Sequence, residues 1–254
     1  MNTIRTQIKN LAEIFDLDPR PARAFAMELP DIPDGAEAWV ARPAIEALQR
    51  NYFPQINDPD KMHCRGIELV LSKIQEHREL HNQFHSRLER VIKPNQLRIH
   101  SRTVPFLDQI AQAQKGDIQI IAVQLGRLYC EESVSDARLS FFENEFGLDS
   151  ITVGSVILTH PRRFINMDDR YVFCAGEECC GEHIEFKNCP SFDQFLSRSG
   201  GGISCISYGY GGIHYKSSFY GAASGFVPEL RATKGKRVRS WKIPIPMRTQ
   251  PVFA

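Results

Sequence analysis

The chain has 254 residues, 42% of them hydrophobic and 24% charged, which provides enough apolar material for a core and excludes wholesale disorder. Its net charge is +1, so no overall excess of charge indicates nucleic acid or a membrane as partner. No apolar run is long enough to cross a bilayer, and the N-terminus lacks a hydrophobic signal core. The sequence therefore predicts a cytoplasmic protein whose seven cysteines stay reduced.

The first 168 residues predict a helix-rich part that contains one buried strand. Apolar residues at helical spacing predict a helix over 3–15. Steps of three and four then run from Ile67 to Val91 and predict one long helix over 66–92, with a break near Asn82 as the alternative. The apolar segment 117–125 predicts a strand. Further helices are expected over 21–27, 43–48 and 103–114, from Ser133 to Gly147, and after Asp149 as an N-cap.

Residues 169–230 predict an antiparallel β part. Short runs of β-branched and aromatic residues alternate with glycines, as in "RYVFC" and "ISCISY". The Gly-Gly pair in "YGYGGIHY" (208–215) predicts a hairpin turn, and "SRSGGG" (197–202) predicts a loop. The expected fold is α+β: a helical and mixed part (1–168), a β part packed on it (169–230) and an extended basic tail (231–254).

Three segments of the chain resemble a known group of sequences. "GDIQIIAVQLGR", "NEFGLDSITVGSVILTHPRR" and "YGAASGFVPE" are similar to a family of uncharacterised bacterial proteins, many from candidate-phylum genomes. The similarity covers roughly the last two thirds of the chain. The family has no assigned activity, so the resemblance implies a bacterial or mobile-element origin but no reaction and no functional residues. It also implies an irregular region around 81–93.

The segment "CAGEECCGEHIEFKNC" (174–189) is the densest group of candidate ligands. Zinc takes four Cys or His ligands, and the set predicted for it is Cys174, Cys180, His183 and Cys189, with Cys179 turned away. The favoured interpretation, however, is a strand pair, "YVFCAG" to "HIEFKN", in which Cys174 and Cys189 are buried as small hydrophobic residues. A reactive thiol is disfavoured here, because neighbouring glutamates raise a thiol pKa.

Two further groups carry weaker expectations. His77, His81 and His85 could face one side of the long helix, but no HExxH pattern accompanies them, so hydrogen-bonded seam residues are the favoured interpretation. Cys130 follows the predicted strand and is the best-placed candidate nucleophile. The histidine suggested as its partner is His160.

The C-terminal tail carries the main charge asymmetry of the chain. Residues 231–254 hold seven basic residues and no acidic one, so the tail is +7 and the remaining chain is −6. A basic segment with an interleaved tryptophan can follow a phosphate backbone, or it can dock on protein. The residues expected to make such contacts are Lys234, Lys236, Arg237, Arg239, Trp241 and Lys242.

Since no catalytic constellation is complete, the sequence favours a non-catalytic cytosolic binding or accessory protein that acts through protein partners or self-association. The alternatives are a nucleic-acid-associated factor that uses the tail 231–254, and a metal- or thiol-dependent enzyme centred on 174–189, with zinc as its candidate cofactor. Neither a membrane contact nor an assured cofactor is expected.

Overall fold

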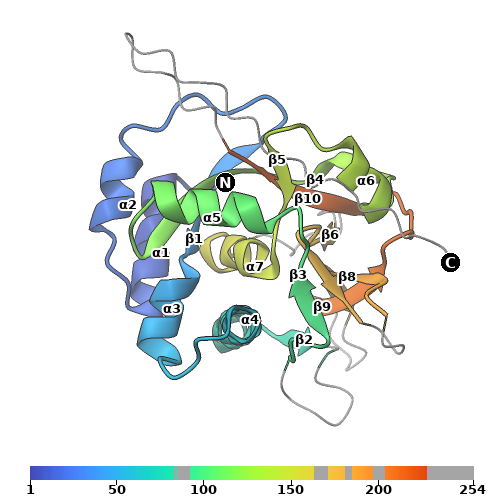
Figure 1. The fold of residues 1–254 in the computed structure, drawn as a ribbon, viewed down its shortest axis with the longest axis horizontal. Coiled ribbons are helices and arrows are strands. Elements are labelled where there is room, and N and C mark those ends of the chain that lie inside the picture. Colours follow the sequence, from blue (N-terminus) through green and yellow to red (C-terminus); the bar gives the residue numbers. More distant parts are fainter. Residues whose placement is uncertain (83, 85–91, 163–170, 181–184, 197–203, 228–254) are drawn as a thin grey trace, which may run out of the picture.

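The structure is a computed structural model that describes residues 1–82, 84, 92–162, 171–180, 185–196 and 204–227 (Figure 1). The predicted tail 231–254 and the predicted loop 197–202 lie outside these residues. Among the described residues there are seven helices and ten strands, so the α+β class is confirmed. No described helix has the length and apolar content needed to cross a membrane.

The helices begin at recognisable sequence signals. Thr3, Asp58, Ser133 and Asp149 each accept a backbone N–H from the first turn of the helix that follows, which is the usual N-cap contact. The helices are α1 (Ile4–Phe15), α2 (Arg20–Phe25), α3 (Ile45–Tyr52), α4 (Pro59–His77), α5 (Val104–Ala113), α6 (Val134–Ser140) and α7 (Ser150–Thr159).

All ten described strands belong to one sheet, whose main path is β1-β4-β10-β6-β8-β7-β3. Most pairs are antiparallel, whereas β10 with β6 and β2 with β9 are parallel. Strands from both 1–168 and 169–230 take part. The strands are β1 (Ala38–Pro43), β2 (Leu80–Asn82), β3 (Leu97–Ile99), β4 (Ile118–Cys130), β5 (Glu145–Gly147), β6 (Tyr171–Phe173), β7 (Glu177–Cys179), β8 (Asn188–Leu196), β9 (Ser204–Gly212) and β10 (Tyr220–Phe226).

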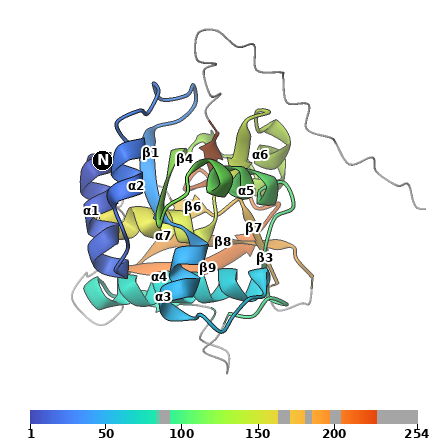
Figure 2. The ribbon, with the colours of Figure 1, turned by 60° about the vertical axis from the view of Figure 1, so that its left-hand side comes forward.

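Helix α7 occupies the centre of the molecule, between α1 and α4 and against the sheet (Figures 1 and 2). Nine of its ten residues are buried. A helix that is apolar on every side is stable only when it is covered on every side. The rest of the fold is therefore arranged around α7. Polar side chains contact the two ends of this helix, and these contacts are described below.

The predicted helix over 66–92 is wrong from Arg78 to Asn82, and its remainder at 83 and 85–91 lies outside the described residues. Helix α4 ends at His77, and residues 80–82 form β2 instead, paired with β9. The segment "EHRELHNQFH" is polar and helix-indifferent, so strand pairing with β9 overrides the continued spacing. The predicted hairpin turn at Gly211-Gly212 is also wrong, because both glycines lie within β9 and pair with β8.

A close approach of two backbones fixes the start of β7 beside the start of α7. A Cβ atom on Gly147 would lie 2.2 Å from the carbonyl carbon of Ala175, so only glycine fits there. The Gly176 N–H donates to the Leu148 carbonyl at 2.8 Å. As a consequence, Glu177 and the N-terminus of α7 are held next to each other.

Candidate functional site

The structure places the cysteine segment differently from the proposed zinc set. Cys174, Cys179 and Cys189 are buried, and the Cys189 thiol lies 3.3 Å from the Cys174 carbonyl oxygen. Cys180 instead faces the other side of β7, where its sulfur lies 3.5 Å from the Asn95 carbonyl oxygen. Alternation along the strand thus turns Cys179 inward and Cys180 outward, the reverse of what the zinc set requires. His183 lies outside the described residues, and those that are described hold no cluster of three metal-ligating side chains.

The buried thiols are held in their neutral form. Burial raises the pKa of Cys174 and of Cys179, and it raises that of Cys189 to about 12. The nearby Glu177 carboxylate acts in the same direction. A neutral thiol is a poor nucleophile, and these side chains fill space as small apolar groups, as the strand-pair interpretation expected for Cys174 and Cys189.

The other candidate residues are not brought together as a helical or catalytic set. His77 is the exposed last residue of α4, and His81 lies in β2, so the two cannot share one helix face; His85 lies outside the described residues. The Cys130 thiol lies 3.6 Å from the Ser218 carbonyl oxygen, whereas the His160 Nδ1 contacts the Val156 carbonyl oxygen at the end of α7.

The interior holds a polar centre that the sequence did not predict, formed by His63, Ser150, Glu177 and Tyr208. The His63 Nε2 lies 2.6 Å from one Glu177 oxygen, and both side chains are buried. The Ser150 hydroxyl donates to the other Glu177 oxygen and lies 2.9 Å from the Tyr208 hydroxyl. Four elements, α4, α7, β7 and β9, supply these side chains.

A buried ion pair lies beside the polar centre. The Arg42 guanidinium of β1 is 2.9 Å from Asp149, and their side chains are 4% and 0% exposed. Asp149 is also the N-cap of α7, accepting the Thr152 N–H at 2.8 Å. Burial alone would raise the pKa of Asp149, but Arg42, His63 and the Thr152 hydrogen bonds outweigh it and lower that pKa.

The polar centre has the residue types of a hydrolytic site but not its arrangement. In a Ser-His-acid site the histidine accepts the hydroxyl proton, and the carboxylate accepts from the other ring nitrogen. Here the Ser150 hydroxyl donates to Glu177, and the His63 Nε2 contacts the other oxygen of the same carboxylate. All four side chains are buried. The arrangement therefore satisfies buried donors and fastens the start of α7 to three other elements.

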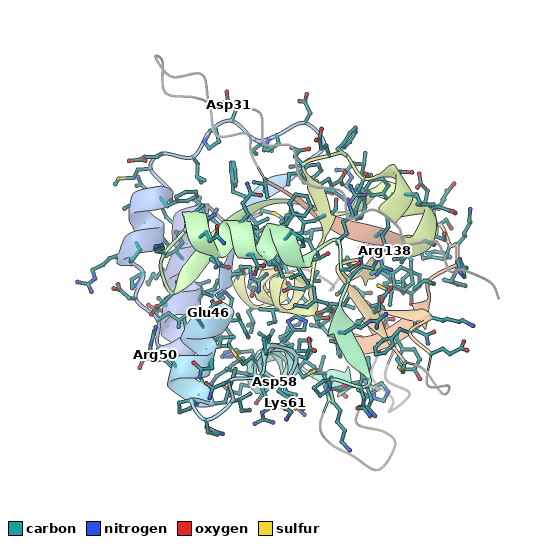
Figure 3. The ribbon with its side chains drawn as sticks, viewed as in Figure 1. Asp31, Glu46, Arg50, Asp58, Lys61 and Arg138 are labelled. Atoms are coloured by element: carbon teal, nitrogen blue, oxygen red, sulfur yellow. The ribbon has the colours of Figure 1, made fainter. Side chains whose placement is uncertain are left out.

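Arg138 fixes the neighbouring turn. Its guanidinium donates to the carbonyl oxygens of Ala175 at 2.9 Å and Glu177 at 2.7 Å, so α6 is fastened to the start of β7 (Figure 3). The Arg138 side chain is buried. Helix α6 is consequently anchored to β7 through a buried side chain.

Large apolar side chains are exposed on α6 and on the segments beside it. Leu139 and Phe142 are 83% and 57% exposed, and Tyr215 and Phe219, in the connection from β9 to β10, are 52% and 69% exposed. The connection lies against α6, because the Ser135 N–H donates to the Ile213 carbonyl at 3.0 Å (Figure 1). These four side chains are called the α6 surface below. Apolar side chains gathered on one exposed surface are typical of a protein contact.

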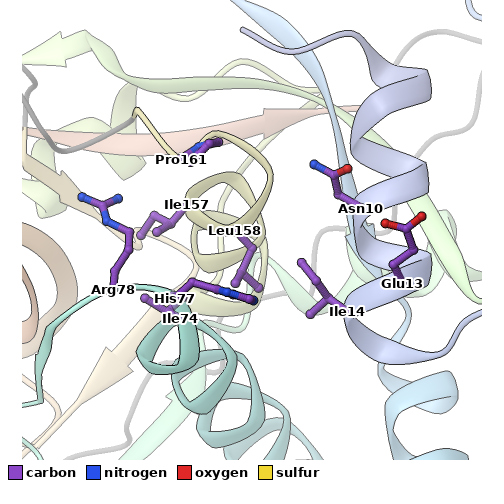
Figure 4. Close-up of a pocket in the computed structure, with 9 residues that line it drawn as sticks. All are labelled: Asn10, Glu13, Ile14, Ile74, His77, Arg78, Ile157, Leu158 and Pro161. Atoms are coloured by element: carbon purple, nitrogen blue, oxygen red, sulfur yellow. The ribbon is translucent and has the colours of Figure 1, made fainter.

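A pocket of about 510 Å³ opens at the other end of the molecule, where α1, α4 and α7 meet (Figure 4). The C-terminal ends of α4 and α7 form part of its wall. Its size is that of ligand-binding pockets, which are roughly 300–1,000 Å³. The lining residues are Asn10, Glu13, Ile14, Ile74, His77, Arg78, Ile157, Leu158 and Pro161.

The six predicted contact residues of the basic tail, from Lys234 to Lys242, lie outside the described residues. Comparison of the chain with protein-family models, curated proteins and solved structures found no match.

Proposed function

We propose that the protein is a non-catalytic binding or accessory protein of the cytoplasm that acts through contact with another protein chain, and that the α6 surface makes this contact. The observation that supports the proposal is the exposure of four large apolar side chains on α6, just after it, and on the β9–β10 connection that contacts it. A partner that covers exposed apolar side chains removes their surface from water, which stabilises the complex.

The charges beside the α6 surface favour a second copy of the chain as the first partner to test. Lys216 and Asp136 form an exposed ion pair at 2.7 Å there, so both signs of charge are present on the same face. A two-fold interface brings a patch against itself, and mixed charge suits that arrangement. The enzyme alternative centred on 174–189 gains no support from the three buried, neutral thiols.

The first test is the mass of the protein in solution. Sedimentation analysis is expected to give a dimer of the 28.9 kDa chain. Leu139→Glu places a charge in the centre of the contact and is expected to weaken the dimer at least about tenfold. Met27→Glu is the matched control, because Met27 is 73% exposed but lies just after α2, away from the α6 surface. A wild-type monomer, or a Leu139→Glu dimer of unchanged strength, would contradict self-association.

The basic tail supports nucleic-acid binding as a second candidate function. Its seven basic residues without an acidic one are the observation in favour. If they contact phosphates, the affinity for generic single-stranded DNA or RNA falls steeply with salt, with a logarithmic slope near −0.7 per neutralised phosphate. Fluorescence anisotropy from low to high salt measures this slope. A flat response would remove the candidate, and a chain in which Lys234, Lys236 and Arg237 are replaced by Gln is expected to lose part of the slope.

A further inference from the structure

The pocket between α1, α4 and α7 has an apolar floor. Ile74 and Ile157 are buried at its base, and Ile14 and Leu158 are half-buried between them and the solvent. Figure 4 shows Ile14 of α1 and Leu158 of α7 next to each other across the pocket. Such a floor stabilises the aliphatic or aromatic body of a ligand by roughly 25 cal/mol for each Å² of apolar surface removed from water.

The wall formed by α1 carries the negative charge of the pocket. Figure 4 shows Asn10 and Glu13 side by side on this wall. The one ion pair of Glu13 among the described residues is with Lys9 at 3.8 Å, and both side chains are about two-thirds exposed, at 64% and 66%. An exposed pair of that length contributes little, so Glu13 is able to pair with a ligand instead.

The ends of the two other helices reinforce that charge. Helices α4 and α7 both direct their C-terminal ends at the pocket, and a C-terminus is the negative end of the helix dipole. The last turn of α7 contains no basic residue. The positive groups at the pocket, His77 and Arg78, both come from the end of α4, so the α1 and α7 sides favour a cation.

The geometry points to a binding site for a small molecule with an apolar body and one cationic amino group. The body lies on Ile14, Ile157 and Leu158, and the ammonium group lies beside Glu13 and Asn10. A lysine side chain of a protein partner shares this chemistry, with four methylene groups and one ammonium group. The inference does not depend on the α6 surface, which lies on a different part of the molecule (Figure 1).

The test uses three probes of equal chain length on the full-length protein: hexylammonium, hexanol and hexanoate. Isoleucine δ1-methyl NMR spectra report binding directly, because Ile14, Ile74 and Ile157 line the pocket. Hexylammonium at millimolar concentration is expected to shift these methyl signals and to saturate. Hexanoate is expected to bind about tenfold more weakly, since on the α1 and α7 sides its charge is repelled by Glu13 and by the C-terminal end of α7. A short peptide with one lysine is compared with hexylammonium. Tighter binding of the peptide indicates a lysine of a protein partner, and weaker binding indicates a small molecule.

Glu13→Gln is expected to weaken hexylammonium about two- to fivefold, the contribution of an exposed ion pair, and to leave hexanol unchanged. Glu46→Gln is the matched control, because Glu46 is exposed on α3 and does not line the pocket (Figure 3). Equal affinity for hexylammonium and hexanoate would overturn the proposal. Unshifted signals of Ile14, Ile74 and Ile157 in a folded protein would overturn it as well.

Discussion

Asp149→Ala is expected to lower the free energy of unfolding by about 4–6 kcal/mol. Removing one partner of a buried ion pair leaves the other charge buried and unpaired, which costs about 3–5 kcal/mol. Here the remaining charge is that of Arg42, whose side chain is 4% exposed. The same substitution removes the N-cap of α7, worth about 1 kcal/mol. Urea unfolding of wild type and variant measures the difference.

Asp58→Ala separates the two contributions. Asp58 caps α4 by accepting the Lys61 N–H at 2.9 Å, but it is exposed and has no ion pair among the described residues (Figure 3). Its loss is expected to cost about 1 kcal/mol. If Asp149→Ala costs no more than this, the pair with Arg42 contributes nothing. Asp149→Asn keeps an acceptor for the cap and removes the charge, so it remains informative should Asp149→Ala fail to fold.

Acid unfolding gives Asp149 an independent readout. The pKa of Asp149 is lowered in the folded protein. Its contribution to the free energy of unfolding is therefore complete above the pKa of the unfolded chain, roughly 3.9, and is lost as pH falls toward the pKa of the folded protein. Wild-type stability is therefore expected to fall below about pH 4. The fall should be shallower in Asp149→Asn, where no carboxylate titrates at this position. Equal slopes would show that other carboxylates carry the acid transition.

The elements that local signals define were predictable from the sequence. The helix after Asp149 begins at its predicted cap, and the helix over 3–15 appears as α1. The strand over 117–125 appears within β4, which continues through Gly126 to Cys130. Gly126 has φ +89°, a backbone state that favours glycine, so the residue expected to end the strand instead forms an irregularity inside it.

What could not be predicted depends on distant pairing. His63 and Glu177 are 114 residues apart, and neither lies in a pattern that identifies the other. Within "CAGEECC" the inward positions alternate, so Glu177 and Cys179 face the core while Glu178 and Cys180 face outward. The spacing of ligand types in sequence carries no information about that phase, because it is set by which strand the segment pairs with.

Glu177→Ala is expected to lower the free energy of unfolding by about 3–5 kcal/mol. The substitution removes the acceptor of both His63 and Ser150 inside the core. Each buried polar group left without a partner costs about 1–3 kcal/mol, and the lost side chain leaves a cavity. The start of α7 also loses its side-chain bond to β7, although the backbone bond from Gly176 to Leu148 remains. Calorimetry together with urea unfolding measures the loss.

Glu178→Ala is the matched control for Glu177→Ala, since the two residues are neighbours on β7 and face opposite sides. Glu178 is 15% exposed and pairs with the exposed Arg98 at 2.9 Å and with the buried Arg138 at 3.4 Å. Because Arg138 keeps its bonds to the Ala175 and Glu177 carbonyl oxygens, the loss of Glu178 is expected to cost about 1–2 kcal/mol, less than the loss of Glu177. Tyr208→Phe removes one hydroxyl from the polar centre, whereas Ser150 still donates to Glu177, so about 1 kcal/mol is expected there as well. If all three substitutions lower the free energy of unfolding equally, the Glu177 carboxylate does not hold the polar centre together. If Glu177→Ala alone is severe, the carboxylate is the group that holds His63, Ser150 and the start of α7 together.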